Sequence, residues 1–212
     1  MVLKNFIVFE GIDGAGTSTQ IKRMREKTKG NDAFLFTAEP TSCETGKFLR
    51  KMLKGEVPLQ NESAAYLFAA DRNEHVNGTF NADGATLITG IKKACENGKT
   101  VISDRYLFSS LAYQSIQCDP NVPRLLNSLF PLPELLFYFD ITPEISLARL
   151  GGREYREIYE NTQFLQKTVA EYKKIIAEYA SPEKNEGMRI VTIDATIPPD
   201  EVESLLWKEI CR

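Results

Sequence analysis

A glycine-rich stretch directly after a short apolar run constrains the fold of this chain more than any other feature. The apolar run is residues 6–9, and the glycines begin two residues later. Gly11, Gly16 and Ser18 fit the spacing G-x-x-x-x-G-K-[ST], with Thr17 in the position of the lysine. A backbone that wraps around a phosphate needs positive φ angles and space where a Cβ would be, and glycine provides both. The stretch therefore predicts a phosphate-binding loop between a buried strand and a helix.

The same loop supplies candidate contacts for the phosphate groups of a nucleotide. Its backbone N–H groups and the N-terminus of the following helix provide positive potential without a formal charge. The hydroxyl of Ser18 is a candidate ligand for Mg²⁺. The alternative interpretation is a glycine-rich turn in which Ser18 caps the helix. The candidate phosphate-binding residues are Gly11, Asp13, Gly14, Ala15, Gly16, Thr17, Ser18 and Thr19.

Four further apolar runs predict strands, at residues 34–37, 100–103, 135–139 and 190–193. Segments with helical patterns separate the strands, and the first of these helices is expected at residues 18–29. Short strands that are apolar on both faces and alternate with helices form parallel sheets with helices on both faces. We therefore expect an α/β fold with a five-stranded parallel sheet, in which residues 1–212 form a single domain.

Polar residues follow the second strand, at the edge of the sheet where ligands bind in such folds. Glu39 precedes the rigid Pro40, with Arg50 further on. Glu39 is a candidate contact for Mg²⁺ or a hydroxyl group, and a polar turn is the alternative interpretation. On the next predicted helix, Phe68 and Arg72 share one face. Such a pair can stack on a nucleobase and bind its carbonyl, while a core phenylalanine beside a surface arginine is the alternative.

Asp104 and Arg105 follow the third strand. An aspartate at a strand end can hold hydrated Mg²⁺, and an arginine can bind a phosphate through two parallel hydrogen bonds. On the helix that follows, Ser110, Tyr113 and Gln114 are candidate contacts for a bound base. The alternative interpretation is a salt-bridged helix N-terminus that Asp104 caps.

The segment after the fourth strand carries a cluster of basic residues. Arg149, Arg153 and Arg156 lie around a Gly-Gly pair. Arginines beside a glycine hinge are typical of a mobile lid that closes over phosphates during transfer. We place this short lid at about residues 149–160, and a solvated helix face is the alternative interpretation.

The charge balance argues against a nucleic-acid partner. With 26 basic and 29 acidic residues the formal net charge is -3, so a broad positive surface is not expected. The apolar run near the N-terminus is too short for a signal peptide or a membrane span. The four cysteines form no C-x-x-C pair, which indicates free thiols in a reducing compartment. We expect a cytoplasmic protein without a nucleic-acid or membrane partner, and a structural or surface position for His75.

Taken in order, these segments resemble those of the thymidylate kinases. The resemblance runs from about residue 5 to about residue 200 and rests on residues 9–16, 39–40, 68–72, 104–106, 109–110, 112–114 and 193–195 and the lid arginines. The Asp-Arg-Tyr segment with Ala-Tyr-Gln is its most specific part, because the glycine loop alone indicates only a P-loop protein. The resemblance implies a P-loop NTPase-type fold, ATP and Mg²⁺ as cofactors, and a homodimer that acts on small-molecule nucleotides.

The family transfers the γ-phosphate of ATP to thymidine monophosphate (dTMP), and this reaction implies roles for individual residues. Asp13 would contact the sugar and help to organise the acceptor phosphate, which Arg50 and Arg105 would bind. Phe68 would stack on thymine, and Arg72 would bind its carbonyl. The residues expected to bind dTMP are Glu39, Pro40, Arg50, Phe68, Arg72, Arg105, Ser110, Tyr113 and Gln114.

Further candidates concern the metal, the adenine and the catalytic residues. Ser18 and Asp104 would bind the metal, and Glu39 would order water or metal near the acceptor phosphate. The chain near Ala195, after the last strand, would lie against adenine. The catalytic candidates are Asp13, Arg105, Arg149 and Arg153.

This chain departs from the family's pattern at two positions. Thr17 replaces the loop lysine, and Ala38 replaces an arginine that often precedes Glu39 in bacterial members. A basic lid without a basic residue at Gly14 or Ala15 resembles the subtype whose catalytic arginine comes from the lid. We therefore expect an active thymidylate kinase, with two alternatives: a nucleotide-binding regulatory protein that has lost turnover, and a related deoxynucleoside kinase.

Overall fold

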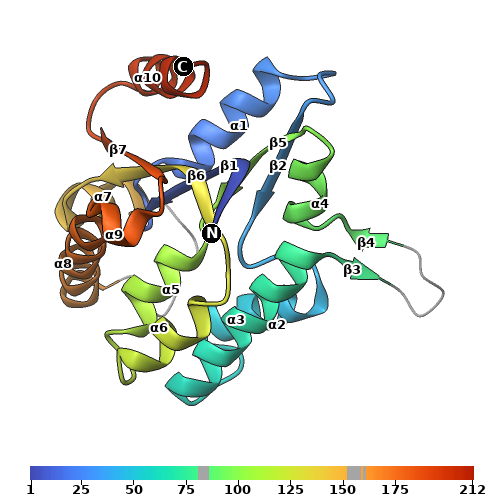
Figure 1. Ribbon diagram of the computed structural model, residues 1–212. Coiled ribbons are helices and arrows are strands. Elements are labelled where there is room, and N and C mark those ends of the chain that lie inside the picture. The colour runs from blue at the N-terminus through green and yellow to red at the C-terminus, as the bar shows by residue number, and fades with distance from the viewer. Residues whose placement is uncertain (81–85, 152–158, 160) are drawn as a thin grey trace.

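A five-stranded parallel sheet forms the centre of the molecule (Figure 1). The computed structural model describes residues 1–80, 86–151, 159 and 161–212. The strand order is β2-β5-β1-β6-β7. All five strands predicted from the sequence are confirmed, and their bounds are β1 Val2–Gly11, β2 Phe34–Ala38, β5 Thr100–Asp104, β6 Leu132–Asp140 and β7 Arg189–Asp194.

The central strand, β1, is buried on both faces. Ile7 pairs with Ile102 of β5 on one side and with Leu135 of β6 on the other. Phe6 and Val8, whose side chains point to the same face, have no exposed surface. Each Å² of apolar surface removed from water stabilises the fold by roughly 25 cal/mol. Because β1 is buried on both faces, its sequence is a continuous apolar run rather than an alternating pattern.

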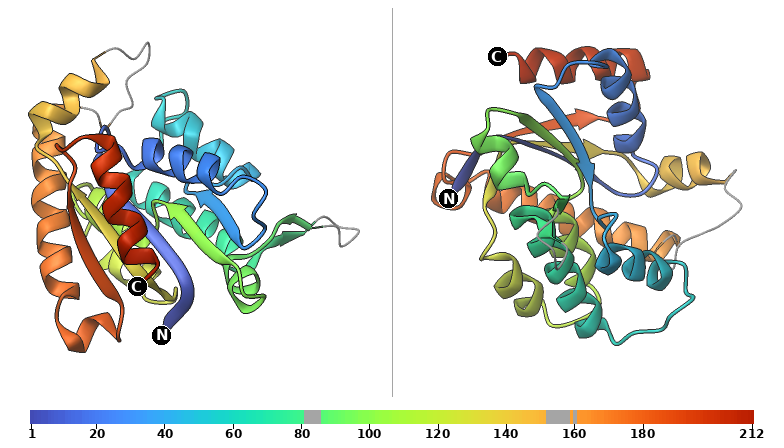
Figure 2. Two further views of the ribbon diagram at one scale, coloured as in Figure 1. Left: turned by 90° about the horizontal axis from the view of Figure 1, so that it is seen from above. Right: turned by 90° about the vertical axis from the view of Figure 1, so that its right-hand side faces the viewer.

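Two helices cover one face of the sheet. They are α1, Thr17–Lys27, and α10, Pro199–Ile210, which lie together above the strands in the right-hand view of Figure 2. Arg23 of α1 pairs with Glu203 of α10 at 2.7 Å, and Leu206 of α10 is fully buried. The C-terminal helix therefore holds α1 in place, and with it the loop that precedes α1.

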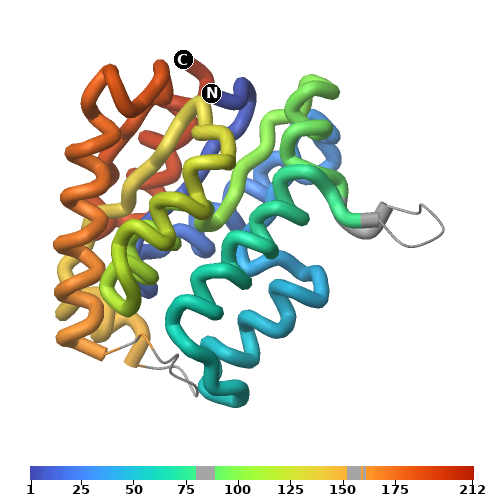
Figure 3. The backbone as a smooth tube through the Cα atoms, turned by 60° about the horizontal axis from the view of Figure 1, so that its bottom comes forward, coloured from blue at the N-terminus to red at the C-terminus, as the bar shows by residue number. Residues whose placement is uncertain are grey.

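The opposite face carries two layers of helices. The inner helices are α4 Ile91–Glu96, α5 Leu107–Gln114 and α8 Thr162–Tyr179. The outer group consists of α3 Asn61–Asn77 and α6 Asn121–Asn127, which pack against α5, and of α2 Glu44–Leu53, which packs against α3. Figure 3 shows α8, α5 and α3 side by side beneath the sheet. This layering confirms the predicted α/β fold of the P-loop NTPase type, with helices on both faces.

The remaining elements lie at the ends of the sheet. They are the helices α7 Pro143–Leu150 and α9 Pro182–Asn185 and the hairpin strands β3 Thr79–Phe80 and β4 Thr86–Ile88. The hairpin projects away from the sheet (Figure 1), and our sequence analysis did not predict it. Across the described part of the chain, no helix is both long enough and apolar enough to cross a bilayer.

The strand order places the loop after β1 in the crevice where ligands bind. β1 lies between β5 and β6, and the chain leaves β1 toward one face of the sheet but leaves β5 toward the other. Such a reversal opens a crevice beyond the carboxyl ends of the strands. Because all five strands are parallel, the polar residues that follow them come together at this single edge.

Candidate active site

The loop between β1 and α1 has the backbone of a phosphate cradle. Gly14 and Gly16 have φ angles of 78° and 97°, a region that residues with a Cβ rarely adopt. α1 begins at Thr17, and its N-cap residue, Gly16, makes no side-chain cap hydrogen bond. The helix N-terminus is therefore left without a capping side chain at a point where its dipole favours an anion.

Ser18 and Asp104 bind each other, and neither caps a helix. Ser18 is the second residue of α1, and its Oγ donates to Asp104 Oδ2 at 2.5 Å. The N-cap of α5 is Tyr106, so both capping interpretations are wrong. Asp104 Oδ1 is buried and has no hydrogen-bond partner among the described residues. A hydroxyl beside a carboxylate with a free oxygen suits the oxygen-only coordination of Mg²⁺.

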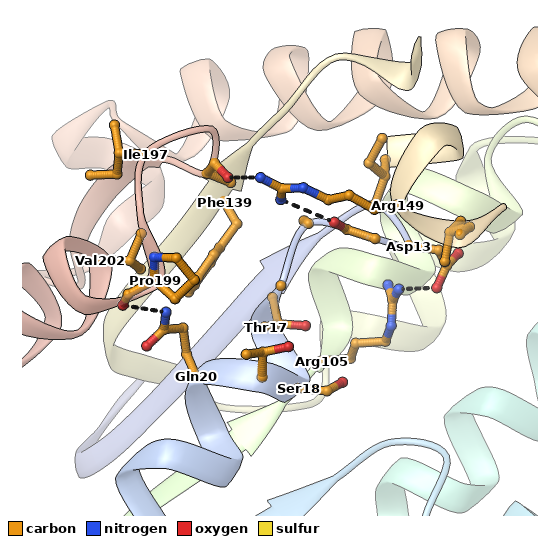
Figure 4. Close-up of a pocket in the computed structure, with 17 residues that line it drawn as sticks. Asp13, Thr17, Ser18, Gln20, Arg105, Phe139, Arg149, Ile197, Pro199 and Val202 are labelled. Atoms are coloured by element: carbon orange, nitrogen blue, oxygen red, sulfur yellow. Dashed lines mark hydrogen bonds and ion pairs between the residues drawn. The ribbon is translucent and has the colours of Figure 1, made fainter. Parts of the chain in front are cut away.

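A cavity of about 500 Å³ lies over the loop. Figure 4 shows that its two ends differ in character. The apolar end is lined by Phe139, Ile197, Pro199 and Val202. The polar end is lined by Arg105, Arg149 and seven of the eight predicted phosphate-binding residues, namely Asp13, Gly14, Ala15, Gly16, Thr17, Ser18 and Thr19. The eighth, Gly11, lies beneath them and accepts a hydrogen bond from Arg105 Nη1 at 3.0 Å.

A second cavity, of about 360 Å³, lies beside the first. All nine residues predicted to bind the acceptor line it: Glu39, Pro40, Arg50, Phe68, Arg72, Arg105, Ser110, Tyr113 and Gln114. They come from the ends of two strands and from α2, α3 and α5, so the fold brings together residues up to 75 positions apart in the sequence (114 − 39 = 75). Phe68 is half-buried there, whereas Ser110, Tyr113 and Gln114 are buried.

The two cavities meet at three residues that line both of them, Asp13, Ser18 and Arg105. Arg105 Nη2 donates to Asp13 Oδ1 at 2.6 Å, and Arg105 Nη1 donates to Ser109 Oγ at 3.1 Å. Tyr113 donates its hydroxyl to the other oxygen of Asp13 at 3.0 Å. A positive and a negative side chain are thus held in fixed orientations at the junction.

The backbone of Arg105 is held in an unusual conformation. Its φ angle is 71°, in the left-handed region that costs a residue with a side chain about 1–3 kcal/mol. Its N–H donates to the carbonyl of Phe9 at 2.9 Å, and its own carbonyl accepts the hydroxyl of Ser103 at 2.8 Å. Burial acts to lower the pKa of Arg105, but the attractions of Asp13, Tyr113, Tyr172 and Asp104 together outweigh it and hold that pKa well above its ordinary value. The guanidinium therefore stays charged at the junction.

A buried ion pair lies at the inner wall of the second cavity. Arg72 Nη2 and Glu39 Oε2 are 2.7 Å apart, and their side chains are 1% and 4% exposed. Arg72 also binds Ser110 and Asn127, and the other oxygen of Glu39 lies 2.9 Å from His75 Nδ1. A surface position for Arg72 and a simple polar turn at Glu39 are therefore wrong. His75 has a structural place in this network, and Asn127 is a member that the sequence did not indicate.

Arg50 fixes the loop after β2. Its Nη1 donates to the carbonyl of Thr41 at 2.9 Å, and its Nη2 donates to the carbonyl of Pro40 at 2.5 Å. These contacts hold the guanidinium against the chain at the rim of the second cavity, which it lines.

Glu10 is a candidate functional residue that was not predicted from the sequence. Glu10 is the penultimate residue of β1 and is fully buried. Burial raises the pKa of its carboxyl to about 7, against the opposing effect of hydrogen bonds from Ser109 and Tyr172 and of the charge of Arg105. A signal for it was present, since an acidic residue inside an otherwise apolar strand has to be paired or neutral.

Arg149 joins the phosphate loop to the segment after β7. Its Nη2 donates to the carbonyl of Ala195 at 2.8 Å, and its Nη1 donates to the carbonyl of Gly14 at 3.3 Å (Figure 4). Arg149 therefore has specific partners on the wall of the larger cavity, which a solvated helix face would not give it. Arg153, and with it residues 152–158 and 160 of the predicted lid, lies outside the described residues.

This fold, with a phosphate loop between two connected cavities, defines a P-loop nucleotide-binding protein that has a place for a second substrate. A family model described as thymidylate kinase matches residues 9–206. The chain belongs to the thymidylate kinase family, whose members are phosphotransferases.

Individual relatives agree with this assignment along most of their length. The chain is 37% identical over 203 residues to the thymidylate kinase of Leptospira borgpetersenii, covering 93% of this chain and 88% of the relative. It is 41% identical over 177 residues to the thymidylate kinase of Leptospira interrogans serogroup Icterohaemorrhagiae serovar copenhageni, covering 81% of each chain. A protein of Methanococcus aeolicus named "Probable thymidylate kinase" is 38% identical over 209 residues, covering 98% of this chain and 96% of the relative.

Proposed function

We propose that the larger cavity binds ATP and the smaller one binds dTMP, and that the γ-phosphate passes between them to give ADP and dTDP. The observation that carries this assignment is that both cavities share Asp13, Ser18 and Arg105. A donor and an acceptor placed in the two cavities bring their phosphates to these shared residues. Phosphoryl transfer depends chiefly on such positioning and on stabilisation of charge.

The smaller cavity has the chemistry to bind a nucleoside monophosphate. Arg50 and Arg105 place two positive charges along its lining, which favours an acceptor that already carries a phosphate. Such an acceptor is an anion, so the reaction needs no base to activate it, whereas a bare nucleoside would. Phe68 offers a ring on which a base can stack, and the ion pair of Arg72 and Glu39 is the polar wall that faces the base or sugar.

The larger cavity has the chemistry to bind a nucleoside triphosphate with Mg²⁺. Its apolar end suits a base, and its polar end, at the N-terminus of α1, suits the phosphates. Ser18 and Asp104 would hold Mg²⁺, which supplies neutralisation of phosphate charge when bound. In the described part of the chain, no three His, Cys, Asp or Glu side chains gather as a metal site, so the phosphates and water would complete the coordination.

A lid arginine is proposed to replace the missing loop lysine. Thr17 is uncharged and lies at the start of α1. Among the described lining residues of the larger cavity, the cationic ones are Arg105 and Arg149, and Arg149 already touches the loop at Gly14. Arg153 remains our first candidate for this role, because it follows the Gly-Gly hinge, and Arg149 is the second.

An ADP-release assay on the purified full chain tests the proposed function. We expect turnover with dTMP as acceptor and little with thymidine or with other nucleoside monophosphates. Turnover with thymidine but not with dTMP would identify a deoxynucleoside kinase. ATP binding without turnover on any of these acceptors would identify a regulatory protein.

We further propose a cytoplasmic homodimer that acts on free nucleotides rather than on nucleic acid. Two large apolar side chains, Leu125 of α6 and Leu129 just beyond it, are 73% and 83% exposed, and a second copy would shield them from water. All four cysteines are free thiols, which fits a reducing compartment. Light scattering should give twice the mass of one chain, and Leu129→Glu should shift the protein toward the mass of one chain.

A further inference from the structure

Near the end of β1, the buried carboxylate of Glu10 is surrounded by hydrogen-bond donors. Oε1 of Glu10 accepts the N–H of Tyr106 at 2.8 Å and the N–H of Ser109 at 3.1 Å. Oε2 accepts the hydroxyl of Ser109 at 2.6 Å and that of Tyr172 at 2.8 Å. Four donors on two oxygens match a carboxylate that carries its charge. Glu10 thereby also caps the first turn of α5 from β1, because the N-cap residue of α5 makes no side-chain cap hydrogen bond.

Ser109 connects this carboxylate to the junction of the two cavities. Its Oγ donates to Glu10 and accepts a hydrogen bond from Arg105 Nη1 at 3.1 Å. The guanidinium also donates to Asp13 and to the carbonyl of Gly11, both at the phosphate loop, and it lies over the ring of Tyr113 of α5, 5.4 Å from the ring centroid. Among the described residues, Ser109 therefore makes the hydrogen bond that ties the guanidinium to α5, and Glu10 fixes the position of Ser109 by binding both its backbone N–H and its hydroxyl.

We propose that Glu10 is a positioning residue for phosphoryl transfer, which holds the guanidinium of Arg105 in its productive orientation through the hydroxyl of Ser109. This inference rests on the proposed role of Arg105 in binding the acceptor phosphate. Glu10 lines neither cavity, so its effect on a substrate passes through its neighbours.

The charge of Glu10 determines how well Glu10 can hold the guanidinium of Arg105 through Ser109. Protonation adds a fifth donor to a shell of four, so at least one of the hydrogen bonds has to break or reverse. It also removes the attraction between the carboxylate and the charge of Arg105. Because burial places the pKa of Glu10 at about 7, the charged form predominates only above neutral pH.

Among the residues that the structure describes, Arg105 is the charged side chain that acts on Glu10. Tyr172 of α8 donates its hydroxyl to Glu10, Tyr106 at the start of α5 donates its backbone N–H, and Tyr138 lies opposite Glu10 in β6. Burial raises the pKa of all three tyrosines, so they stay protonated through neutral pH. The acidic side chains of Asp13 and Asp104 lie on the far side, against Arg105 and Ser18.

Glu10→Gln in the full chain tests the proposal, because it keeps the shape of the side chain while it removes the charge and replaces an acceptor by a donor. At pH 8 we expect kcat/KM for dTMP to fall at least tenfold and the KM for ATP to stay within twofold. Calorimetric titration with dTMP, which needs no turnover, should show the same loss of affinity when ATP is absent.

Two further measurements separate positioning from a merely structural role. Ser109→Ala should reproduce the loss, and the double variant should be no worse than the more damaging single variant, because both act through one contact. The ratio of wild-type to Glu10→Gln activity should shrink as the pH falls from 8 to 6, since the wild-type carboxyl then becomes neutral as well. A structural effect would leave this ratio constant.

Glu134→Gln is the matched control. Glu134 also accepts hydrogen bonds within the sheet, from Asn5 and Lys4, and lines neither cavity, so this variant should keep wild-type kinetics.

A Glu10→Gln enzyme with kcat/KM for dTMP within twofold of the wild type at pH 8 overturns the inference, and so does an equal loss at pH 6 and pH 8. If Glu10→Gln fails to fold, Ser109→Ala with wild-type kinetics overturns it. A wild type that does not phosphorylate dTMP overturns the proposed function instead.

Discussion

Arg105 Nη2 lies 2.6 Å from Asp13 Oδ1, and this ion pair stands where the two cavities meet. The pair is partly open, with the two side chains 22% and 18% exposed, so a ligand in either cavity can reach it. Asp13 belongs to the loop after β1 and Arg105 to the end of β5. The pair therefore holds the phosphate loop against the wall of the proposed acceptor site, and it orients the guanidinium before any substrate arrives.

Arg105→Lys should lower kcat/KM for dTMP at least tenfold. Lysine keeps the charge, but one ammonium group cannot reproduce a planar fork that contacts Gly11, Ser109 and Asp13 together. Steady-state kinetics with dTMP as the varied substrate checks this. Arg124→Lys, which alters a surface pair with Glu178, is the matched control and should leave the kinetics unchanged. A fully active Arg105→Lys enzyme would remove Arg105 from the site.

Phe68→Ala should weaken dTMP binding by ~1–3 kcal/mol, the usual effect of losing an aromatic platform under a base. ATP binding should barely change, because Phe68 lines only the smaller cavity. Calorimetric titration with each nucleotide measures both effects, and Phe48→Ala, at an exposed ring on α2, controls for general loss of apolar surface. Equal losses for both nucleotides, or loss of the fold, would show that Phe68 is simply a core residue.

Local patterns predicted the parts of this molecule that local physics determines. The apolar runs became the five strands, and the glycine spacing became the loop before α1. The alternative interpretations that relied on local capping rules failed at Ser18 and Asp104, since each found its partner in the other, 86 positions away. Capping is the usual role of such residues near a helix start, but a partner supplied by a neighbouring strand replaced it here.

Interactions between distant positions could not be read from the sequence. Arg72 meets Glu39 across 33 positions and Asn127 across 55, and Glu10 meets Tyr172 across 162. Each contact exists only because the strand order brings those segments together. A charged residue that is buried needs a partner, but the sequence does not indicate which residue that partner is.

The pH dependence of stability should reveal the buried Glu10. Because burial raises its pKa from 4.5 to about 7, the folded state holds a proton on Glu10 between these values while the unfolded state does not. The contribution of Glu10 to stability is thus fully present below pH 4.5 and is lost as the pH rises through 7. The free energy of unfolding of Glu10→Gln, measured in urea, should therefore rise relative to that of the wild type between pH 4.5 and pH 8, by on the order of 3 kcal/mol. A difference that does not vary with pH would contradict this.

Asp104→Asn should raise the Mg²⁺ concentration needed for half-maximal activity by about 10–100-fold, the usual cost of disturbing a metal's immediate surroundings. The amide of asparagine keeps the shape of the carboxylate but lacks its charge. An NH₂ donor also replaces one of the two carboxylate oxygens beside Ser18. A titration of activity with Mg²⁺ at saturating nucleotides measures this. Asp194→Asn, at the end of β7 and bound to Thr196, is the control. An unchanged Mg²⁺ requirement would exclude Asp104 from the metal site.

The lid should supply the positive charge that Thr17 lacks. A loop lysine normally bridges the β- and γ-phosphates, and loss of one preorganised donor costs ~2.7–4 kcal/mol, or about 10²–10³ in rate, where nothing replaces it. Thr17 leaves only its backbone N–H near the phosphates, so Thr17→Ala should cost less than tenfold in kcat.

Arg153→Ala should cost more than a hundredfold in kcat with a smaller effect on ATP affinity. Arg149→Ala should have the next largest effect, because Arg149 already contacts the loop at Gly14. Single-turnover kinetics separates the transfer step from binding and release. Near-full turnover in both arginine variants would show that the lid does not replace the lysine.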